Sequence, residues 1–121
     1  MLLEEDLSYE IRGAIYEVYE HLGHGYLERI YERALLLELK ARGLRADCQV
    51  PLAVRYKGQV VGEYFADVVV EDRVIVELKA QSRLTSADEV QLLNYLAASG
   101  LRVGLLVNFA YPKARIKRLV S

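Results

Sequence analysis

Cysteine is almost absent from this chain of 121 residues. Cys48 stands alone, so no disulfide can form within the chain, which is typical of proteins from a reducing cytosol. Its neighbours Gln49 and Val50 favour a strand, and we therefore expect Cys48 to be a packed, unreactive thiol.

Long apolar runs are also lacking. The longest candidate, Ala34 to Leu39, is interrupted by Glu38 and is far too short to cross a bilayer. Residues 2–6 do not provide the positive region that a secretion signal requires. These absences predict a cytoplasmic protein that has no membrane partner.

The chain has almost no net charge. Its formal charge of −1 excludes a strong overall field that would draw it onto nucleic acid. Basic residues do gather near the end of the chain, where such a stretch is most often a solvated edge (Lys113, Arg115, Lys117 and Arg118). A hydrophobic share of 53% with 27% charged residues predicts one globular domain over residues 1–121.

Three segments have the apolar spacing or the boundary signals of helices. Residues 8–22 form an amphipathic pattern that Asp6 or Ser8 can cap, and residues 27–42 are apolar around most of the helix, which predicts deep burial. Gly43 can end the second helix. Residues 86–89, Ser-Ala-Asp-Glu, resemble a capping box that opens a third helix ending near Ser99.

The remaining segments predict strands. Residues 44–56 and 60–70 flank a Lys-Gly-Gln turn, residues 74–80 follow, and residues 101–109 read as a buried strand. Pro51 favours an edge position for the first strand. Residues 114–120 fit either a strand or a short helix. The order α-α-β-β-β-α-β predicts an α/β (α+β) fold with a central mixed sheet and helices on both sides.

The most informative segment is the predicted hairpin of residues 66–80, because it carries charges on a sheet face. If Val70 pairs with Val74 around a three-residue turn, Asp67 lies opposite Glu77, and Lys79 shares the face of Glu77. This register predicts one apolar face, made of Tyr64, Ala66, Val68, Val70, Val74, Val76 and Leu78. The other face is then made of Phe65, Asp67, Val69, Ile75, Glu77 and Lys79.

Two carboxylates on a half-buried face are costly unless they are paired or bind a cation. Carboxylate oxygens suit a hard divalent ion, and magnesium often takes only one or two protein carboxylates. A lysine two residues after a ligand can orient a water molecule or neutralise a phosphate. The alternative is a cross-strand salt bridge of Asp67, Glu77 and Lys79 on a solvated edge.

Two motifs together resemble a known family. Residues 25–31, Gly-Tyr-Leu-Glu-Arg-Ile-Tyr, fit the pattern GxxExxY, and Asp67 followed by Glu77-Leu78-Lys79 fits the pattern D…ExK. The chain thereby resembles the GxxExxY proteins of the PD-(D/E)XK, or restriction-endonuclease-like, nuclease superfamily over essentially its whole length. The resemblance implies a core of helix, three-stranded meander, helix and strand.

The resemblance also implies roles for individual residues. Asp67 and Glu77 correspond to ligands of Mg²⁺ or Mn²⁺, Lys79 to the residue that orients or activates water, and Glu28 to a helix-borne acid beside the metal. Gln91 and Tyr95 lie four apart on one helix face, where some nucleases contact the nucleic-acid backbone or the water. Gln91 is the stronger candidate of the two, because a partly buried tyrosine is ordinary.

Several other residues have simpler interpretations. Tyr31 shares a helix face with Glu28, but we expect Tyr31 to be a core residue. His21 and His24 straddle a helix end without a third ligand nearby, so we expect surface positions. Glu71 and Asp72 are expected to be turn residues.

Three functional hypotheses follow. The first is a divalent-metal-dependent nuclease that hydrolyses DNA, or alternatively RNA, with a metal-activated water. The second is a catalytically weak nuclease-fold module that binds nucleic acid or a protein partner. The third is an unrelated domain with a structural salt-bridge cluster. A homodimer would allow both strands of a duplex to be cut, and edge strands offer a way of pairing.

Overall fold

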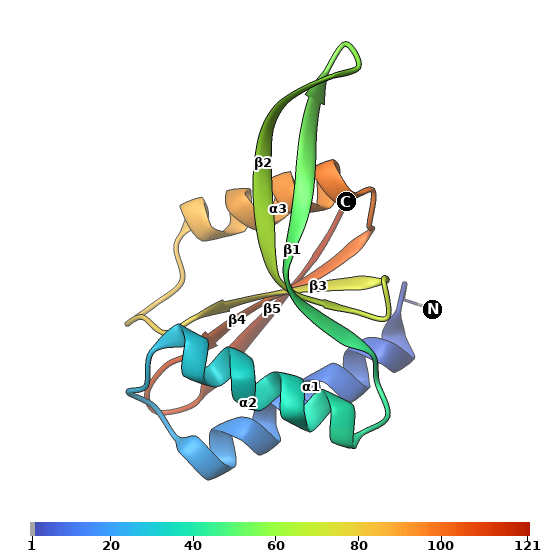
Figure 1. The fold of residues 1–121 in the computed structure, drawn as a ribbon. Coiled ribbons are helices and arrows are strands. Elements are labelled where there is room, and N and C mark those ends of the chain that lie inside the picture. The colour runs from blue at the N-terminus through green and yellow to red at the C-terminus, as the bar shows by residue number, and fades with distance from the viewer. Residues whose placement is uncertain (1) are drawn as a thin grey trace.

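The computed structural model describes residues 2–121, which fold around one five-stranded sheet (Figure 1). The strands follow the order of the sequence, β1-β2-β3-β4-β5, and only β3 and β4 are parallel. The strand bounds are Ala46–Tyr56, Gln59–Val70, Val74–Lys79, Val103–Phe109 and Ala114–Val120. The predicted mixed sheet is confirmed, and the undecided segment 114–120 is a strand.

Helices cover both faces of the sheet, as the sequence predicts. The helices α1 (Glu5–Leu22) and α2 (Glu28–Ala41) lie on one face, and α3 (Ser86–Ser99) lies on the other (Figure 1). Because α3 connects the parallel strands β3 and β4, it forms the crossover that the element order predicts. Pro51 lies in β1, an edge strand, where its missing N–H leaves no gap in the sheet.

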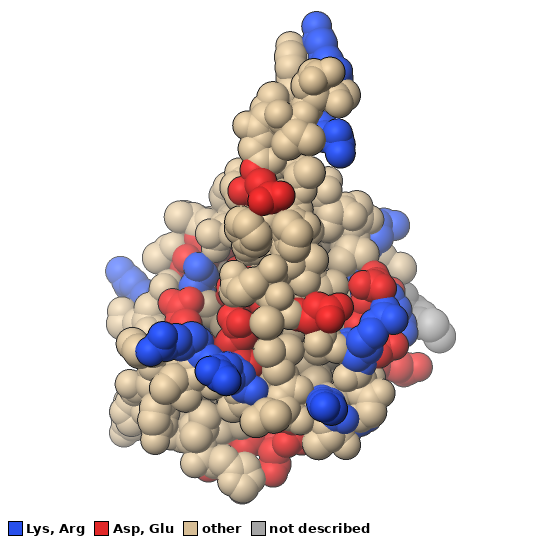
Figure 2. Space-filling view, in the orientation of Figure 1, with Lys and Arg blue, Asp and Glu red and all other residues tan. Residues whose placement is uncertain are grey.

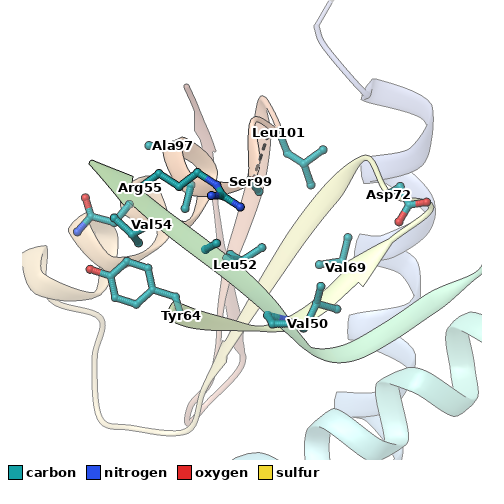
Figure 3. A pocket seen from close by; sticks show the side chains of 14 residues that line it. Val50, Leu52, Val54, Arg55, Tyr64, Val69, Asp72, Ala97, Ser99 and Leu101 are labelled. Atoms are coloured by element: carbon teal, nitrogen blue, oxygen red, sulfur yellow. Dashed lines mark hydrogen bonds between the residues drawn. The ribbon is translucent and has the colours of Figure 1, made fainter. Parts of the chain in front are cut away.

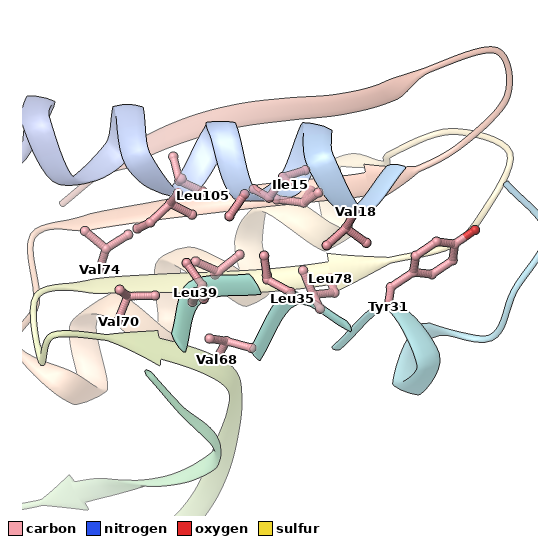
Figure 4. Close-up of a cluster of buried hydrophobic side chains, with 14 of the residues drawn as sticks. Ile15, Val18, Tyr31, Leu35, Leu39, Val68, Val70, Val74, Leu78 and Leu105 are labelled. Atoms are coloured by element: carbon pink, nitrogen blue, oxygen red, sulfur yellow. The ribbon is translucent and has the colours of Figure 1, made fainter. Parts of the chain in front are cut away.

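The larger core lies between the sheet and the pair α1 and α2 (Figure 4). The helices contribute Ile11, Ile15 and Leu35, among others, and the strands contribute mainly valines. Tyr31 is fully buried, and its ring stacks on Phe109 with centroids 4.1 Å apart. Its hydroxyl donates a hydrogen bond to the carbonyl of Gly23 at 2.6 Å, so the polar end is satisfied. Tyr31 is therefore a core residue, as expected.

Helix α2 is buried on one side only, which corrects the prediction of deep burial. Tyr31, Leu35 and Leu39 are completely buried at a spacing of four residues, whereas Leu37 is 71% exposed. Ala34 and Leu36 are partly buried at the edge of this core, and the side of α2 that carries Leu37 faces solvent. Periodicity predicts which residues can be buried, but the number of covering elements decides how many are.

Two helix starts differ from the prediction. Thr85, rather than Ser86, caps α3 and forms the capping box with Asp88. The first helix begins at Glu5, so Asp6 and Ser8 lie inside it and no side chain caps it. Both differences are shifts within one turn, where several polar residues compete for the cap.

Cys48 is exposed, contrary to the expected packed thiol. It lies on β1, and an edge strand offers fewer covering neighbours than a central one. His21 and His24 are also exposed, as expected, and Glu71 and Asp72 form the turn between β2 and β3. No helix within residues 2–121 combines the length and the hydrophobicity that a membrane span needs.

The hairpin of β1 and β2 extends beyond the sheet as a two-stranded arm (Figure 1). The strand β2 pairs with β1 almost to the tip, at Tyr56 and Gln59, but its pairing with β3 is limited to three residue pairs that end at Val68 and Val76. The residues beyond this point therefore belong to the arm alone.

The arm is rotated relative to the sheet, which corrects part of the predicted face pattern. Val68 and Val70 face α1 and α2 as predicted, but Ala66 packs in the smaller core under α3. Tyr64 packs against Tyr95 of α3, with ring centroids 5.1 Å apart. A change in chain direction near residue 67 thus moves Tyr64 and Ala66 to the opposite face from Val68.

The one-sided burial of α2 gives a matched pair of substitutions. Leu35→Ala should lower the free energy of unfolding by about 2–5 kcal/mol, because it leaves a cavity in the main core. Leu37→Ala should change it by less than about 0.5 kcal/mol, since Leu37 is mostly in solvent. Urea denaturation measures both, and similar losses for the two variants would contradict this packing.

Candidate metal and catalytic site

Asp67 and Glu77 meet where β2 and β3 separate. The predicted pairing of Val70 with Val74 is confirmed, and it places Asp67 opposite Glu77 on the face that α3 covers. The backbone N–H of Asp67 donates to Glu77 Oε1 at 2.8 Å, and the backbone N–H of Leu78 donates to Asp67 Oδ2 at 2.9 Å. Each carboxylate thus accepts a hydrogen bond from the backbone of the other strand.

These two hydrogen bonds replace the strand ladder at this position. An unpaired backbone N–H inside the protein would cost free energy, and the carboxylates prevent that loss. The bonds also fix both side chains in one orientation. One oxygen of each carboxyl group is used in this way, and Glu77 Oε2 accepts no hydrogen bond from residues 2–121.

The buried carboxyl group of Glu77 is electrostatically unusual. Its residue is only 3% exposed, and burial followed by the negative charge of Asp67 raises the pKa of Glu77 from 4.5 to about 9. Lys79 opposes this shift but does not reverse it. Burial and the charges of Glu77 and Asp67 also raise the pKa of Tyr95, which lies nearby on α3.

The pair has the donor chemistry of a divalent cation site. Burial and then the charge of Asp67 raise the pKa of Glu77, and a bound cation would favour the ionised form of both carboxyl groups. Magnesium accepts this small number of carboxylates when water or phosphate completes the shell. In the described part of the chain, no group of three or more His, Cys, Asp or Glu side chains is arranged to hold a metal.

Lys79 is oriented by α3. Its Nζ donates to Gln91 Oε1 at 3.0 Å and lies 4.0 Å from Asp88 Oδ1. The side chain of Lys79 is 17% exposed, so the ammonium group lies near the surface but is held in place. The structure thus brings Lys79 and Gln91 together, on the same side of the sheet as Asp67 and Glu77.

A network that the sequence did not reveal supports the end of β3. Asn108 is 1% exposed and makes two hydrogen bonds with the backbone of Gln81, of 2.9 and 3.0 Å. The Gln81 side chain in turn donates to Asp88 Oδ2 at 2.6 Å. These contacts hold the residues after Lys79 against β4. A polar residue inside an apolar strand was the only signal for Asn108.

Glu28 and Glu32 lie one turn apart on α2, and their positions differ. Glu28 is exposed in the first turn and makes no hydrogen bond to Asp67 or Glu77. Glu32, which is not one of the fixed residues of either motif, is partly buried and is linked to Asp67 through the Gln49 amide. The role predicted for Glu28 stays a prediction.

A pocket between β1 and α3 lies away from these acids. It has a volume of about 860 Å³, and mostly apolar side chains such as Leu52, Val54 and Leu101 line it (Figure 3). Asp67, Glu77 and Lys79 are not among its lining residues. The pocket therefore does not include the two carboxyl groups that could bind a cation.

The raised pKa of Glu77 predicts how stability depends on pH. Between pH 4.5 and about 9 the folded protein keeps a proton on Glu77 that the unfolded chain releases, so this group stabilises the fold at low pH and loses its effect as pH rises. Relative to Glu77→Gln, the wild type should lose roughly 1 kcal/mol of stability per pH unit across this window.

Urea unfolding at several pH values in the presence of a chelator measures this effect. The control is Glu63→Gln, the same substitution at an exposed residue of the arm. Parallel stability curves for the wild type and Glu77→Gln would show that Glu77 is ionised normally in the folded protein.

Comparison with known proteins gives the family. The family model described as the PD-(D/E)XK nuclease superfamily matches residues 5–119. No curated protein matches the sequence. Among solved structures, the crystal structure of SSO0001 is similar with a TM-score of 0.64 at 15% identity, covering 95% of this chain and 77% of that chain, which shows the fold alone. Since the family match extends over nearly the whole sequence, the chain belongs to the PD-(D/E)XK nuclease superfamily, whose members generally use divalent metals.

Proposed function

We propose that this protein is a divalent-metal-dependent nuclease that hydrolyses phosphodiester bonds of DNA, with RNA as the alternative substrate. Within the superfamily, we place it with the GxxExxY proteins, because the motif is complete in residues 25–31. The single observation that carries the proposal is the pairing of Asp67 and Glu77 at the strand junction, with Lys79 on the same side of the sheet.

Asp67 and Glu77 would hold Mg²⁺ or Mn²⁺ with the oxygens that the backbone hydrogen bonds leave free. When bound, the cation supplies a more acidic water molecule and neutralises charge on the phosphate. Lys79 adds a fixed positive charge beside the carboxylates, and Gln91 limits the directions in which its ammonium group can point. Lys79 can therefore orient a water molecule or stabilise a negatively charged phosphate without first reorganising.

The surface near the acids offers a place for a polyanion. Figure 2 shows basic side chains over α2, next to acidic side chains at the base of the arm. Arg29, Arg33 and Lys40 are exposed on α2, and none of them has an ion-pair partner among residues 2–121. Arg29 and Arg33 lie one turn apart, on either side of Glu32 in the sequence. Nucleic-acid phosphates would complement these charges.

One observation favours the second candidate, a catalytically weak module that binds nucleic acid or a protein partner. Among the described residues, Asp67 and Glu77 are linked through two backbone hydrogen bonds, and no group of three side chains is arranged to ligate a metal. A module of this kind would bind nucleic acid through the same basic surface without cutting it.

A cleavage assay tests the proposed activity. Asp67→Ala and Lys79→Ala should each lower kcat for hydrolysis of DNA with Mg²⁺ or Mn²⁺ by at least about 100-fold, because each removes fixed charge at the reacting phosphate. Several DNA forms and an RNA should be compared, since the fold does not define the substrate. Asp72→Ala is the control, because Asp72 lies in the exposed turn between β2 and β3.

Equal activity in the wild type and both site variants would come from a contaminant and would refute the proposal. Binding of DNA without any cleavage by the wild type would instead support the module.

Salt dependence of binding tests the basic surface. The double variant Arg29→Ala/Arg33→Ala should bind a labelled duplex at least about tenfold more weakly, and the slope of log affinity against log salt should decrease by roughly 2. Fluorescence anisotropy in metal-free buffer measures this without cleavage.

Arg102→Ala is the control. Arg102 is exposed and lies just before β4, and Asn108, which pairs with Lys79, lies near the other end of that strand. An unchanged salt slope in the α2 double variant would show that nucleic acid binds elsewhere.

A further inference from the structure

Gln49 interrupts an otherwise regular strand pairing. The strands β1 and β2 pair at Cys48 with Val68 and again at Val50 with Ala66, but Gln49 and Asp67 between them are not paired. The φ angle of Gln49 is +50°, in the left-handed region that glutamine rarely adopts. The backbone conformation is therefore unfavourable for this residue type, and compensation must come from its side chain or neighbours.

The Gln49 side chain links α2 to the acidic pair. Its Nε2 donates to Glu32 Oε2 at 3.1 Å and to Asp67 Oδ1 at 3.4 Å. One amide nitrogen thus holds two carboxylates that would otherwise repel each other. Because the amide is neutral, it can hold both acids without removing the negative charge of the site.

Glu32 lies on α2 one turn after Glu28 and contacts the Gln49 amide. It is partly buried, and burial together with the charge of Asp67 raises the pKa of Glu32 although the Gln49 hydrogen bond lowers it. Glu28 lies one turn earlier and is exposed. Residues four apart on an α-helix are separated by about 6 Å along its axis. This distance is enough for Glu32 to contact Gln49 while Glu28, at the start of α2, stays exposed.

We propose that Glu32, rather than Glu28, is the acid of α2 that acts on the Asp67 and Glu77 site, from outside the direct ligands of the cation, and that Gln49 is the positioning residue that sets its place relative to Asp67. This inference rests on the proposed metal-dependent function of the same site. The strained backbone of Gln49 keeps its amide pointed at the two acids, and the missing strand pair opens the space in which they meet.

The arrangement can be tested first in the metal-free protein. The side-chain amide resonances of Gln49, observed by ¹⁵N NMR, should shift in Glu32→Gln and in Asp67→Asn, since each substitution removes a charged acceptor. They should not shift in Glu28→Gln, which is the matched control on the same helix. Unchanged Gln49 resonances in Glu32→Gln and Asp67→Asn would refute the link, whatever the protein does with metals.

Calorimetric titration with Mn²⁺ tests the functional part. Glu32→Gln should weaken Mn²⁺ binding at least tenfold, in the range observed when residues that orient metal ligands are replaced. Glu28→Gln should weaken it by less than about twofold. The reverse ranking, or equal and small effects, would refute the inference and leave the proposed function intact.

Gln49→Gly separates positioning from folding. Glycine tolerates the positive φ angle, so the melting temperature without metal should be unchanged or higher. Mn²⁺ binding should nevertheless be about tenfold weaker, because the amide that orients Glu32 and Asp67 is gone. Full Mn²⁺ affinity in this variant would refute the role of Gln49. A wild type that binds neither Mn²⁺ nor Mg²⁺ would refute the proposed function, and with it the role of Glu32.

Discussion

The site depends on one constraint, the point at which β2 leaves β3. Strands that separate inside a protein leave backbone N–H groups without ladder partners, and these groups must be satisfied. Here the carboxylates of Asp67 and Glu77 satisfy them reciprocally. The same two bonds that end the strand pairing also hold two acids side by side. The architecture of the sheet and the chemistry of the site therefore have a common origin.

Two buried carboxyl groups destabilise the fold when both are ionised, and neighbouring groups reduce this effect. Glu77 retains a proton well above its ordinary pKa, and Lys79 contributes an opposing charge from the same strand. Gln91, Asp88 and Asn108 then fix Lys79 and the segment that follows it. Without a cation, the fold thus keeps the acids together through protonation and hydrogen bonding. This is the state from which a divalent ion would displace a proton.

The sequence predicted a mixed sheet, helices on both of its faces and the opposition of Asp67 and Glu77. These succeeded because strand periodicity is strict and because the turn of residues 71–73 fixes the register. The superfamily was equally accessible from the motifs. The roles of the site residues remain predictions, since geometry alone does not measure catalysis.

The failures have physical causes that a sequence pattern does not contain. Glutamine gives no sequence signal for a positive φ angle, so the irregular pairing at Gln49 could not be foreseen. Nor did strand alternation indicate that Tyr64 and Ala66 face α3. Cys48 and Leu37 are exposed because burial depends on which elements cover a residue, which periodicity does not specify. The contact of Glu32 with Gln49 was not predicted either, because it joins a helix to a strand and leaves no local pattern in the sequence.

The arm formed by β1 and β2 has a consequence for how such proteins can diversify. Within residues 2–121, no third strand pairs with the arm between Asp67 and its tip, so the length of the arm is independent of the rest of the sheet. Adding or deleting one residue in each strand next to the Lys57-Gly58 turn would change its reach and preserve the pairing below. The distance between the tip of the arm and the two acids can thus differ among related chains while Asp67 and Glu77 keep their positions.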